Sequence, residues 1–278
     1  MKKCVLGNGY IGSAFKNAGY DCLDRSQLNV SNIGDWSMRY VLETSLNEYD
    51  VIVNCIAITD TKWTEYPENF AQVYKTNSNF VANLSAYCAS KNKKLVHIST
   101  GDLYGNTQKT QEDSLSLDAN TNYRLSKLVA ERLCSPNDLI LRIRLPFDAR
   151  NHPKNLIVKC LKYNKFYAHK NCYSYVDDII SATNILVDKN QCGIFNIVQP
   201  QSSLLLNLVK LITKDEKIHN LNENVFCSDI SYEWDHVHVH NAMATDKISQ
   251  FFEPQSLNEA WVKSYDTLML TMRNNVVM

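Results

Sequence analysis

The sequence predicts an α/β fold: a Rossmann-type, doubly wound parallel sheet followed by a small C-terminal domain. Short apolar runs alternate with stretches of helical length in the first half of the chain, which is typical of βαβ units. These runs are continuously apolar, as in strands that are covered on both faces. Beyond about residue 151 the segments become shorter and less regular. We therefore expect a sheet domain over 1–150 and a second part over 151–278, some of whose segments return to the core sheet.

The elements follow from the apolar pattern, taken in chain order. Strands are expected over 4–6, 20–23, 50–53, 95–98 and 139–141. Between them the helical pattern covers 10–18, 36–46, a long stretch over 70–90, and 122–134. The second part is expected to contain helices near 155–163, 179–187, 204–212 and 257–272, and a strand at 193–198.

Composition excludes several classes of protein. Lys and Arg number 29 and Asp and Glu also 29, so no basic excess exists to hold nucleic acid. No run of 18 apolar residues could cross a membrane, and the short apolar run at the start is unlike a signal peptide. The nine cysteines are scattered without a C-x-x-C pair, which indicates a reducing, cytoplasmic compartment.

A glycine-rich motif opens the chain. Three of its eight glycines, Gly7, Gly9 and Gly12, form G-x-G-x-x-G between the first strand and the first helix. Gly7 permits the tight turn, Gly9 lets the backbone approach a pyrophosphate, and Gly12 allows close packing of helix and strand. The helix start offers free N–H groups to phosphates. The motif predicts an NAD(P)-binding domain over 1–150, with contacts from Asn8, Tyr10 and Ile11 as well.

The end of the second strand bears on the choice of cofactor. Asp24 can accept hydrogen bonds from an adenosine ribose, which favours NADH. Arg25 follows at once and can hold a 2′-phosphate, which favours NADPH. The choice between NADPH and NADH stays open, and a solvated strand end is the alternative for both residues.

A second constellation carries acid–base chemistry. Tyr123 and Lys127 stand four residues apart on a helical pattern, so phenol and ammonium share one face. A nearby ammonium stabilises phenolate and suits the tyrosine to exchange a proton with a carbonyl oxygen during hydride transfer. Thr100 ends the fourth strand, where parallel-sheet enzymes place function, and its hydroxyl can orient the same carbonyl.

Five runs together resemble the extended short-chain dehydrogenases/reductases that act on nucleotide sugars. The runs are GNGYIG, DVIVNCIA, HISTGDLYG, YRLSK and YVDD, in the family's order along the whole chain. The resemblance implies a catalytic triad of Thr100, Tyr123 and Lys127. It also implies that 151–278 binds the substrate and that a structural or cofactor-loop role falls to Asn77. The cofactor would be lined by Asn54, Cys55, Ile56 and Ala57.

Within that family, the runs CLDRSQLNVSN and LRIRLPFDARNHPKNLIVKCLKYNK resemble the dTDP-4-dehydrorhamnose reductases and the plant 3,5-epimerase/4-reductases. The resemblance implies NAD(P)H-dependent 4-reduction of a nucleotide-linked 4-keto-6-deoxy-hexose. Asp102 stands where the plant enzymes have a cysteine used in epimerisation, and Lys159 matches their partner lysine. Whether 3- or 3,5-epimerisation accompanies reduction stays open, as do the nucleotide, UDP or dTDP, and the substituent on sugar carbon 2.

Two other functions remain as alternatives: a redox-neutral nucleotide-sugar epimerase of the same fold, and a non-catalytic NAD(P)-binding regulatory subunit. Neither would consume NAD(P)H. A dehydratase is disfavoured, because Thr100 is followed by Gly101 and Asp102 rather than by an acid–base pair.

Smaller signals complete the expected site. Arg142 and Arg144 follow the fifth strand and could hold the substrate diphosphate, with an ordinary surface pair as the alternative. Asn155 lies in the matching run and is expected to contact substrate. His236, His238 and His240 alternate, but no spaced acid completes a metal site, so no metal is expected.

The resemblance also implies a homodimer. The helices expected over 70–90 and 122–134 would pair with their copies, and their anchors would be Val81, Leu84, Leu128 and Val129.

Overall fold

The computed structural model describes residues 1–28, 30, 35–105, 107–114, 117–162, 166, 169–214 and 241–274. These residues divide into two compact units. Unit 1 contains Met1–Leu103, Leu115–Arg142 and Ile180–Phe195, and unit 2 contains Tyr104–Ser114, Ile143–Ile179 and Asn196–Met278. The chain thus crosses between units several times, and the 180–195 segment of the second half lies in the unit that holds the N-terminus.

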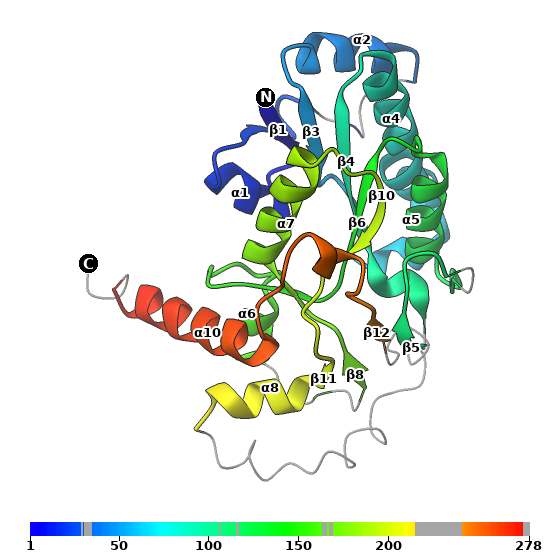
Figure 1. Cartoon of the computed structure of the whole chain (residues 1–278). Coiled ribbons are helices and arrows are strands. Elements are labelled where there is room, and N and C mark those ends of the chain that lie inside the picture. Colours follow the sequence, from blue (N-terminus) through cyan, green and yellow to red (C-terminus); the bar gives the residue numbers. More distant parts are fainter. Residues whose placement is uncertain are drawn as a thin grey trace. The chain divides into compact units, whose positions relative to one another are not determined.

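Unit 1 is built on a six-stranded sheet with the order β10-β6-β4-β3-β1-β2 (Figure 1). Its strands are β1 (Lys3–Leu6), β2 (Asp21–Leu23), β3 (Val51–Asn54), β4 (Lys94–Thr100), β6 (Leu139–Ile143) and β10 (Gly193–Asn196). The neighbouring pairs β1–β2, β1–β3 and β3–β4 are parallel. The predicted doubly wound α/β fold is therefore confirmed.

Helices cover both faces of this sheet (Figure 1). They are α1 (Tyr10–Asn17), α2 (Asp35–Leu46), α4 (Phe80–Ser90), α5 (Asn122–Leu133) and α7 (Val176–Asp188). α4 and α5 lie side by side on one face, and α1 and the later part of α7 lie on the other (Figure 1). Side chains from α2, α4 and the first strands form a buried core that includes Leu6, Met38, Ile52 and Leu84.

The order of the strands reverses between β1 and β3. From β1 the chain moves outward to β2, and then returns to β3 on the other side of β1. Leu6 and Asn54, the last residues of β1 and β3, are direct partners in this parallel pair. The carboxyl ends of β1, β3 and β4 therefore share one edge of the sheet, and such a reversal is where open α/β sheets bind ligands.

The long helix expected over 70–90 is interrupted. The structure has α3 (Phe70–Tyr74), a π-helical turn η3 (Lys75–Asn79) and then α4. Val81 and Leu84, two of the four possible anchors of a dimer, are fully buried within unit 1, so they are not on its outward surface. Their side chains face the protein interior because α4 is apolar on most of its circumference.

Unit 2 contains a four-stranded sheet in the order β11-β8-β12-β5 and a separate pair, β7–β9. Its strands are β5 (Thr107–Thr110), β7 (Pro146–Phe147), β8 (Lys170–Asn171), β9 (Ser174–Tyr175), β11 (Ser203–Leu204) and β12 (Asn241–Met243). Its helices are α6 (Leu156–Cys160), α8 (Leu205–Ile212) and α10 (Leu257–Asn274).

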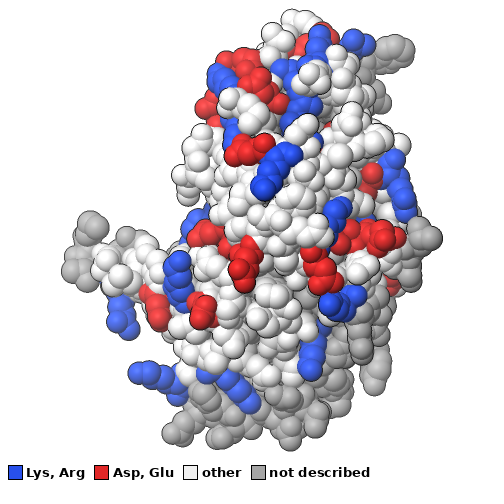
Figure 2. All heavy atoms as spheres, in the orientation of Figure 1, with Lys and Arg blue, Asp and Glu red and all other residues white. Residues whose placement is uncertain are grey.

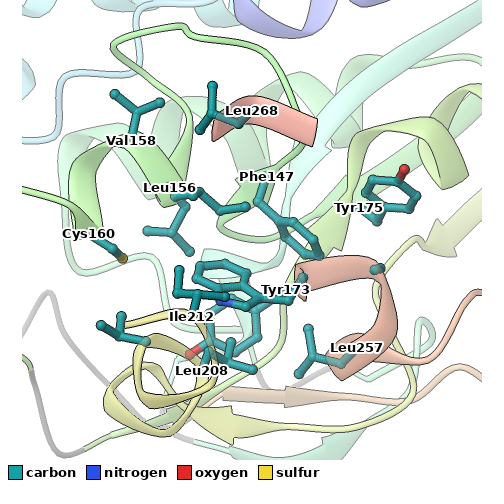
Figure 3. Close-up of a cluster of buried hydrophobic side chains, with 14 of the residues drawn as sticks. Phe147, Leu156, Val158, Cys160, Tyr173, Tyr175, Leu208, Ile212, Leu257 and Leu268 are labelled. Atoms are coloured by element: carbon teal, nitrogen blue, oxygen red, sulfur yellow. The ribbon is translucent and has the colours of Figure 1, made fainter. Parts of the chain in front are cut away.

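The core of unit 2 is aromatic. Trp261 of α10 is fully buried, and its ring centre lies 5.1 Å from that of Phe147 and 6.3 Å from that of Tyr173. Leu208 and Ile212 of α8 belong to the same buried cluster (Figure 3). Unit 2 therefore has a hydrophobic core of its own.

The charges on the visible face are interspersed, and neither sign forms a continuous patch (Figure 2). This agrees with the formal net charge of zero. Among the described residues, no helix is both long enough and apolar enough to cross a membrane.

Candidate active site

The glycine-rich turn has the geometry that its motif predicts. Gly7 has φ +92°, which is unfavourable for a side chain, and its N–H donates to the carbonyl oxygen of Leu23. A Cβ added to Gly12 would lie 1.7 Å from the carbonyl oxygen of Gly7. A Cβ added to Gly9 would meet nothing within 4 Å. The first and third glycines are thus required by the turn itself, whereas Gly9 faces open space.

This open space is suited to a dinucleotide phosphate. Gly9 is the N-cap of α1 and makes no side-chain cap, so the N–H groups of the first helical turn are offered outward. Asn8 is exposed, Ile11 is half-buried and Tyr10 is buried. The backbone of residues 7–12, rather than the side chains of all six, therefore fits a pyrophosphate.

Asp24 follows β2 at the same edge of the sheet. One of its carboxylate oxygens accepts hydrogen bonds from the backbone N–H and the hydroxyl of Ser26, at 2.8 and 2.6 Å. The hydroxyl hydrogen bond is the main cause that lowers the pKa of Asp24. Arg25 is exposed. Both side chains remain candidates for the adenosine end of a cofactor.

The loop after β3 is clamped by Asn77. The side-chain oxygen of Asn77 accepts from the N–H of Ile58 at 2.8 Å, and its nitrogen donates to the carbonyl of Ile58 at 3.0 Å. The same nitrogen donates to the hydroxyl of Ser126 at 3.0 Å. Cys55, Ile56 and Ala57, expected to line the cofactor, are half-buried in this loop beside the glycine turn.

Unit 1 brings the three expected catalytic residues together. Thr100 ends β4, and Tyr123 and Lys127 lie one turn apart on α5. All three are buried. Burial raises the pKa of Tyr123, and the neighbouring Thr100 side chain opposes that rise. Burial lowers the pKa of Lys127 to about 8.

Sequence reasoning missed the contacts of Lys127 with β4. Its Nζ lies 3.1 Å from Nε2 of His97 and donates to the carbonyl oxygen of Ile98 at 2.9 Å. Nδ1 of His97 lies 3.2 Å from Nδ2 of Asn54, the last residue of β3. One signal was visible: His97 interrupts an otherwise apolar strand, Leu95–Ile98.

Glu65 also escaped the sequence analysis. Its carboxylate accepts hydrogen bonds from the backbone N–H groups of Asn122 and Tyr123, at 3.1 and 3.3 Å. Thr121 is the N-cap of α5 and accepts from the N–H of Arg124 at 3.2 Å. These caps satisfy N–H groups that a helix start leaves unpaired, and they fix the first turn of α5, where Tyr123 lies.

Asp102 lies against a guanidinium. Arg124, 1% exposed, lies 3.8 Å from Asp102 and 3.0 Å from Asp118. It also donates to the side-chain oxygen of Asn120 at 2.8 Å. The negative charge of Asp102 is therefore compensated within unit 1. Lys159, its expected partner, is half-buried on α6 of unit 2.

Arg142 forms a buried ion pair with Glu131 of α5. Its Nη2 and Nε lie 2.6 and 3.0 Å from the two carboxylate oxygens, and the side chains are each 2% exposed. The hydroxyl of Ser99 donates to the same carboxylate. Through these bonds Arg142 connects β6 with α5 and β4 in the interior of unit 1. We therefore leave Arg142 out of the proposed substrate site.

The other expected substrate residues lie in unit 2. Arg144 is buried, and two of its guanidinium nitrogens donate to the side-chain oxygen of Asn171 at 3.0 and 3.3 Å. Burial lowers the pKa of Arg144 to about 10. Asn155 is the N-cap of α6, and its amide binds backbone atoms of Asp148, Arg150 and Ile157. Its amide thus shapes the loop before α6, while a substrate contact stays a prediction.

The three alternating histidines, His236, His238 and His240, lie outside the described residues. Within the described part of the chain, no group of three or more His, Cys, Asp or Glu side chains could hold a metal ion.

Comparison with known proteins agrees with this geometry. Residues 4–136 match the model of the NAD dependent epimerase/dehydratase family. A dTDP-D-glucose 4,6-dehydratase of Dictyostelium discoideum is 25% identical over 252 residues, which cover 69% of this chain and 56% of that relative. The chain therefore spans little more than half the length of the curated relative that it matches.

Solved structures share the fold over almost the whole chain. A UDP-rhamnose synthase from Acanthamoeba polyphaga mimivirus has a TM-score of 0.76 at 18% identity, covering 95% of this chain and 99% of that one. A dTDP-4-dehydrorhamnose reductase from Bacillus anthracis, in complex with NADP, has 0.70 at 16%, covering 96% and 98%. A UDP-glucuronic acid 4-epimerase from Bacillus cereus, in complex with NAD, has 0.67 at 21%, covering 98% of each chain.

The doubly wound sheet, the glycine turn and the buried Thr100, Tyr123 and Lys127 agree with the fold of these solved structures. More particularly, just under half of the chain, residues 4–136, matches the NAD dependent epimerase/dehydratase family. The expectation of an NAD(P) cofactor is confirmed at the level of this family.

Proposed function

We propose that the protein is an NAD(P)H-dependent 4-reductase of a nucleotide-linked 4-keto-6-deoxy-hexose of the rhamnose type. One observation carries the proposal: Thr100 at the end of β4 is buried together with Tyr123, near enough to oppose the burial-driven rise in its pKa, and Lys127 lies one helical turn away. This cluster adjoins the edge where β1 and β3 end. A proton donor therefore lies next to the edge of the sheet that is suited to bind a dinucleotide.

Each residue of the cluster has a distinct task. The nicotinamide, when bound, supplies a hydride. Tyr123 donates its phenolic proton to the oxygen of the carbonyl being reduced. The Thr100 hydroxyl lies near the phenol and can bind the same carbonyl oxygen. Lys127 carries a positive charge when protonated and so stabilises the phenolate that Tyr123 leaves behind.

The surroundings of Asp102 favour reduction over dehydration. Elimination of water needs an acid and a base beside the sugar ring, and the chain has Gly101 and Asp102 after Thr100. Only the second of these two positions carries a carboxyl, and Arg124, 3.8 Å from it, also pairs with the closer Asp118. The acid–base pair that elimination needs is therefore incomplete.

The named relatives support the substrate class. A UDP-rhamnose synthase and a dTDP-4-dehydrorhamnose reductase each share the fold over more than nine-tenths of this chain. A 4-epimerase shares it too, and the curated relative is a 4,6-dehydratase. The names of these four proteins have in common a nucleotide-linked hexose, and three of the names refer to carbon 4. The reductase is the member of this set that the Asp102 environment favours.

The decisive experiment measures consumption of reduced cofactor. The full chain is incubated with UDP- or dTDP-4-keto-6-deoxyglucose and with NADH or NADPH, and the sugar products are identified by mass spectrometry. We expect one reduced sugar nucleotide for each reduced cofactor oxidised. Sugar conversion without cofactor oxidation would instead show the redox-neutral epimerase, and no conversion with tight cofactor binding would show a regulatory subunit.

Epimerisation is tested separately with deuterated water. Inversion beside a keto group exchanges the carbon-bound proton with solvent, so epimerisation labels sugar carbon 3 or 5. Because Asp102 is held by Arg124, we expect 4-reduction without such label. Deuterium that appears in the wild-type product and is absent with Asp102→Asn would show that Asp102 takes part in epimerisation. Absence of deuterium with Lys159→Met would show that Lys159 takes part as well.

We also propose that two copies associate through α5. Leu125 and Leu133 are 39% and 49% exposed, and Leu128 and Val129 between them are half-buried. At this spacing the four side chains form an apolar stripe along one side of the helix. Light scattering at micromolar concentration should give twice the chain mass, and Leu125→Glu with Leu133→Glu should give the mass of one chain.

A further inference from the structure

The orientation of the Asn54 side chain is fixed by the backbone. The N–H of Ile56 donates to Oδ1 of Asn54 at 3.0 Å. A backbone N–H can only donate, so the amide oxygen must face it. The amide nitrogen consequently faces Nδ1 of His97, at 3.2 Å. Asn54 and His97 are direct partners in the β3–β4 pair and are fully buried.

This orientation selects the tautomer of His97. The amide nitrogen of Asn54 is a donor only, so Nδ1 of His97 must be the acceptor. Burial lowers the pKa of His97 well below its usual value, and a charge on Lys127 lowers it further, so the ring is neutral with either form of Lys127. A neutral imidazole carries one proton. That proton is therefore on Nε2, the atom that lies 3.1 Å from Nζ of Lys127.

The Nε2–H group thus points at the nitrogen of Lys127. An ammonium has three donors and no acceptor, whereas a neutral amine has a lone pair. We propose that Asn54 and His97 form a positioning relay, in which Asn54 holds His97 as the Nε2–H tautomer and His97 stabilises the amine form of Lys127. The amine form has two N–H donors, and Lys127 donates one of them to the carbonyl oxygen of Ile98.

The ammonium form breaks this complementarity. To accept from an ammonium, Nε2 must lose its proton, and Nδ1–H would then face the amide nitrogen of Asn54. Turning that amide would relieve the conflict only by placing its NH₂ group against the N–H of Ile56. Either arrangement leaves two donors facing each other in a buried site, which costs free energy.

Other titratable groups act on Lys127 in the opposite direction. Glu131 and Cys134 at the far end of α5, and Cys55 after β3, each raise its pKa, and burial outweighs them. Glu131 is itself paired with Arg142. With a pKa of about 8, Lys127 can change protonation state close to neutral pH, as a residue that returns a proton to Tyr123 must. Only this last, kinetic consequence rests on the proposed function.

The tautomer is read directly by nitrogen-15 NMR of the histidine rings in the cofactor-free protein. Loss of signals in His97→Gln assigns His97 among the seven histidines. We expect Nε2 protonated and Nδ1 bare above about pH 8, where Lys127 is mainly the amine. A protonated Nδ1, or a doubly protonated ring, overturns the relay. Because neither substrate nor cofactor is added, this result stands apart from any failure of the proposed reductase activity.

Asn54→Asp tests the direction of the relay. A carboxylate at position 54 can still accept from the N–H of Ile56. It can only accept from His97, so the proton of His97 must move to Nδ1. Nε2 then becomes an acceptor for the ammonium of Lys127. We expect the tautomer to switch and the pKa of Lys127, followed by NMR of its labelled ammonium group, to rise by about 1 unit or more. An unchanged His97 tautomer in the folded variant overturns the relay. If the variant does not fold, the tautomer seen in the wild-type spectrum tests the relay by itself.

Asn184→Asp is the matched control. It adds the same charge to unit 1 at a side chain whose oxygen accepts from Tyr20 and Lys3 rather than contacting His97. The His97 tautomer and the Lys127 pKa should stay as in the wild type. An equal rise in the Lys127 pKa in this control would assign the effect of Asn54→Asp to charge alone and would overturn the relay as its cause.

Discussion

The side chain of Asn77 binds both backbone polar groups of Ile58 and also the hydroxyl of Ser126. Ile58 belongs to the loop that follows β3, where the cofactor is expected, and Ser126 immediately precedes Lys127 on α5. A single buried amide therefore holds the cofactor loop and the catalytic helix in one arrangement. Disturbing either segment should alter the other.

Replacement of Tyr123 by phenylalanine removes the proton donor and keeps the ring. General acid catalysis contributes about 10²–10⁴-fold, so turnover should fall by that order. Binding of the reduced cofactor, measured by fluorescence titration, should persist because the glycine turn is untouched. Near-normal turnover of the folded variant would contradict the assigned role of Tyr123.

The pH dependence of reduction should follow Lys127. Its pKa is lowered to about 8, so the ammonium that stabilises the Tyr123 phenolate is present below that pH and is lost as the pH rises through it. Burial raises the pKa of Tyr123, so the phenol stays protonated over this window. We expect kcat for reduction to decline above about pH 8. A rate that stays flat up to the ordinary lysine value of 10.5 would contradict this assignment.

The second and third glycines of the turn, Gly9 and Gly12, should respond differently to replacement by alanine. In Gly9→Ala the new Cβ meets nothing within 4 Å, so the free energy of unfolding should change by no more than about 0.5 kcal/mol. Dinucleotide affinity should fall, because the methyl group occupies the space left for the pyrophosphate. Gly12→Ala forces a Cβ to 1.7 Å from the oxygen of Gly7 and should destabilise the fold itself. Equal affinity in Gly9→Ala and wild type would mean that the phosphates bind elsewhere.

Cofactor preference should respond to Asp24. Asp24→Ala removes a ribose acceptor and an anion that repels a 2′-phosphate, so NADH should weaken more than NADPH. The variant also loses the turn to Ser26, and Ser26→Ala controls for part of that loss, since it removes the hydroxyl donor and keeps the carboxylate. Calorimetry with both cofactors measures the difference. Unchanged affinities in Asp24→Ala would remove Asp24 from the adenosine site.

The buried ion pair of Arg142 and Glu131 predicts a stability effect rather than a binding effect. Arg142→Leu leaves a buried carboxylate without its partner and should lower the free energy of unfolding by about 3–5 kcal/mol. The double variant with Glu131→Leu should recover most of that loss. Urea unfolding of the single and double variants measures both. A weaker affinity for substrate with unchanged stability would return Arg142 to the substrate site.

The sheet of unit 1 could be predicted because its strands are continuously apolar and its turns are marked by glycine. The grouping of Thr100, Tyr123 and Lys127 could be predicted because they lie in local motifs whose spacing sets their geometry. The helix over 70–90 could not be predicted in detail. Its π-helical turn, Lys75–Asn79, contains no Gly or Pro that would mark an interruption, and it is stabilised by contacts of Asn77 with Ile58 and Ser126, which are distant in sequence.

Partners distant in sequence also explain the residues that were missed. Glu65 caps α5 from more than fifty residues away, and Arg142 pairs with Glu131 across two elements. An arginine that follows a strand has the same appearance in sequence whether it pairs with a buried carboxylate or with a diphosphate. Only the fold decides between these partners.

The π-helical turn over Lys75–Asn79 bears on how this chain tolerates changes of length. A π-helical turn contains one residue more than an α-helical turn that connects the same two ends. Removal of one residue other than Asn77 would therefore leave Phe70–Tyr74 and Phe80–Ser90 near their present positions, whereas removal of a residue elsewhere in this helix would rotate everything beyond it. A library of single-residue deletions should thus find its survivors along this helix concentrated in four codons, those of Lys75, Thr76, Ser78 and Asn79.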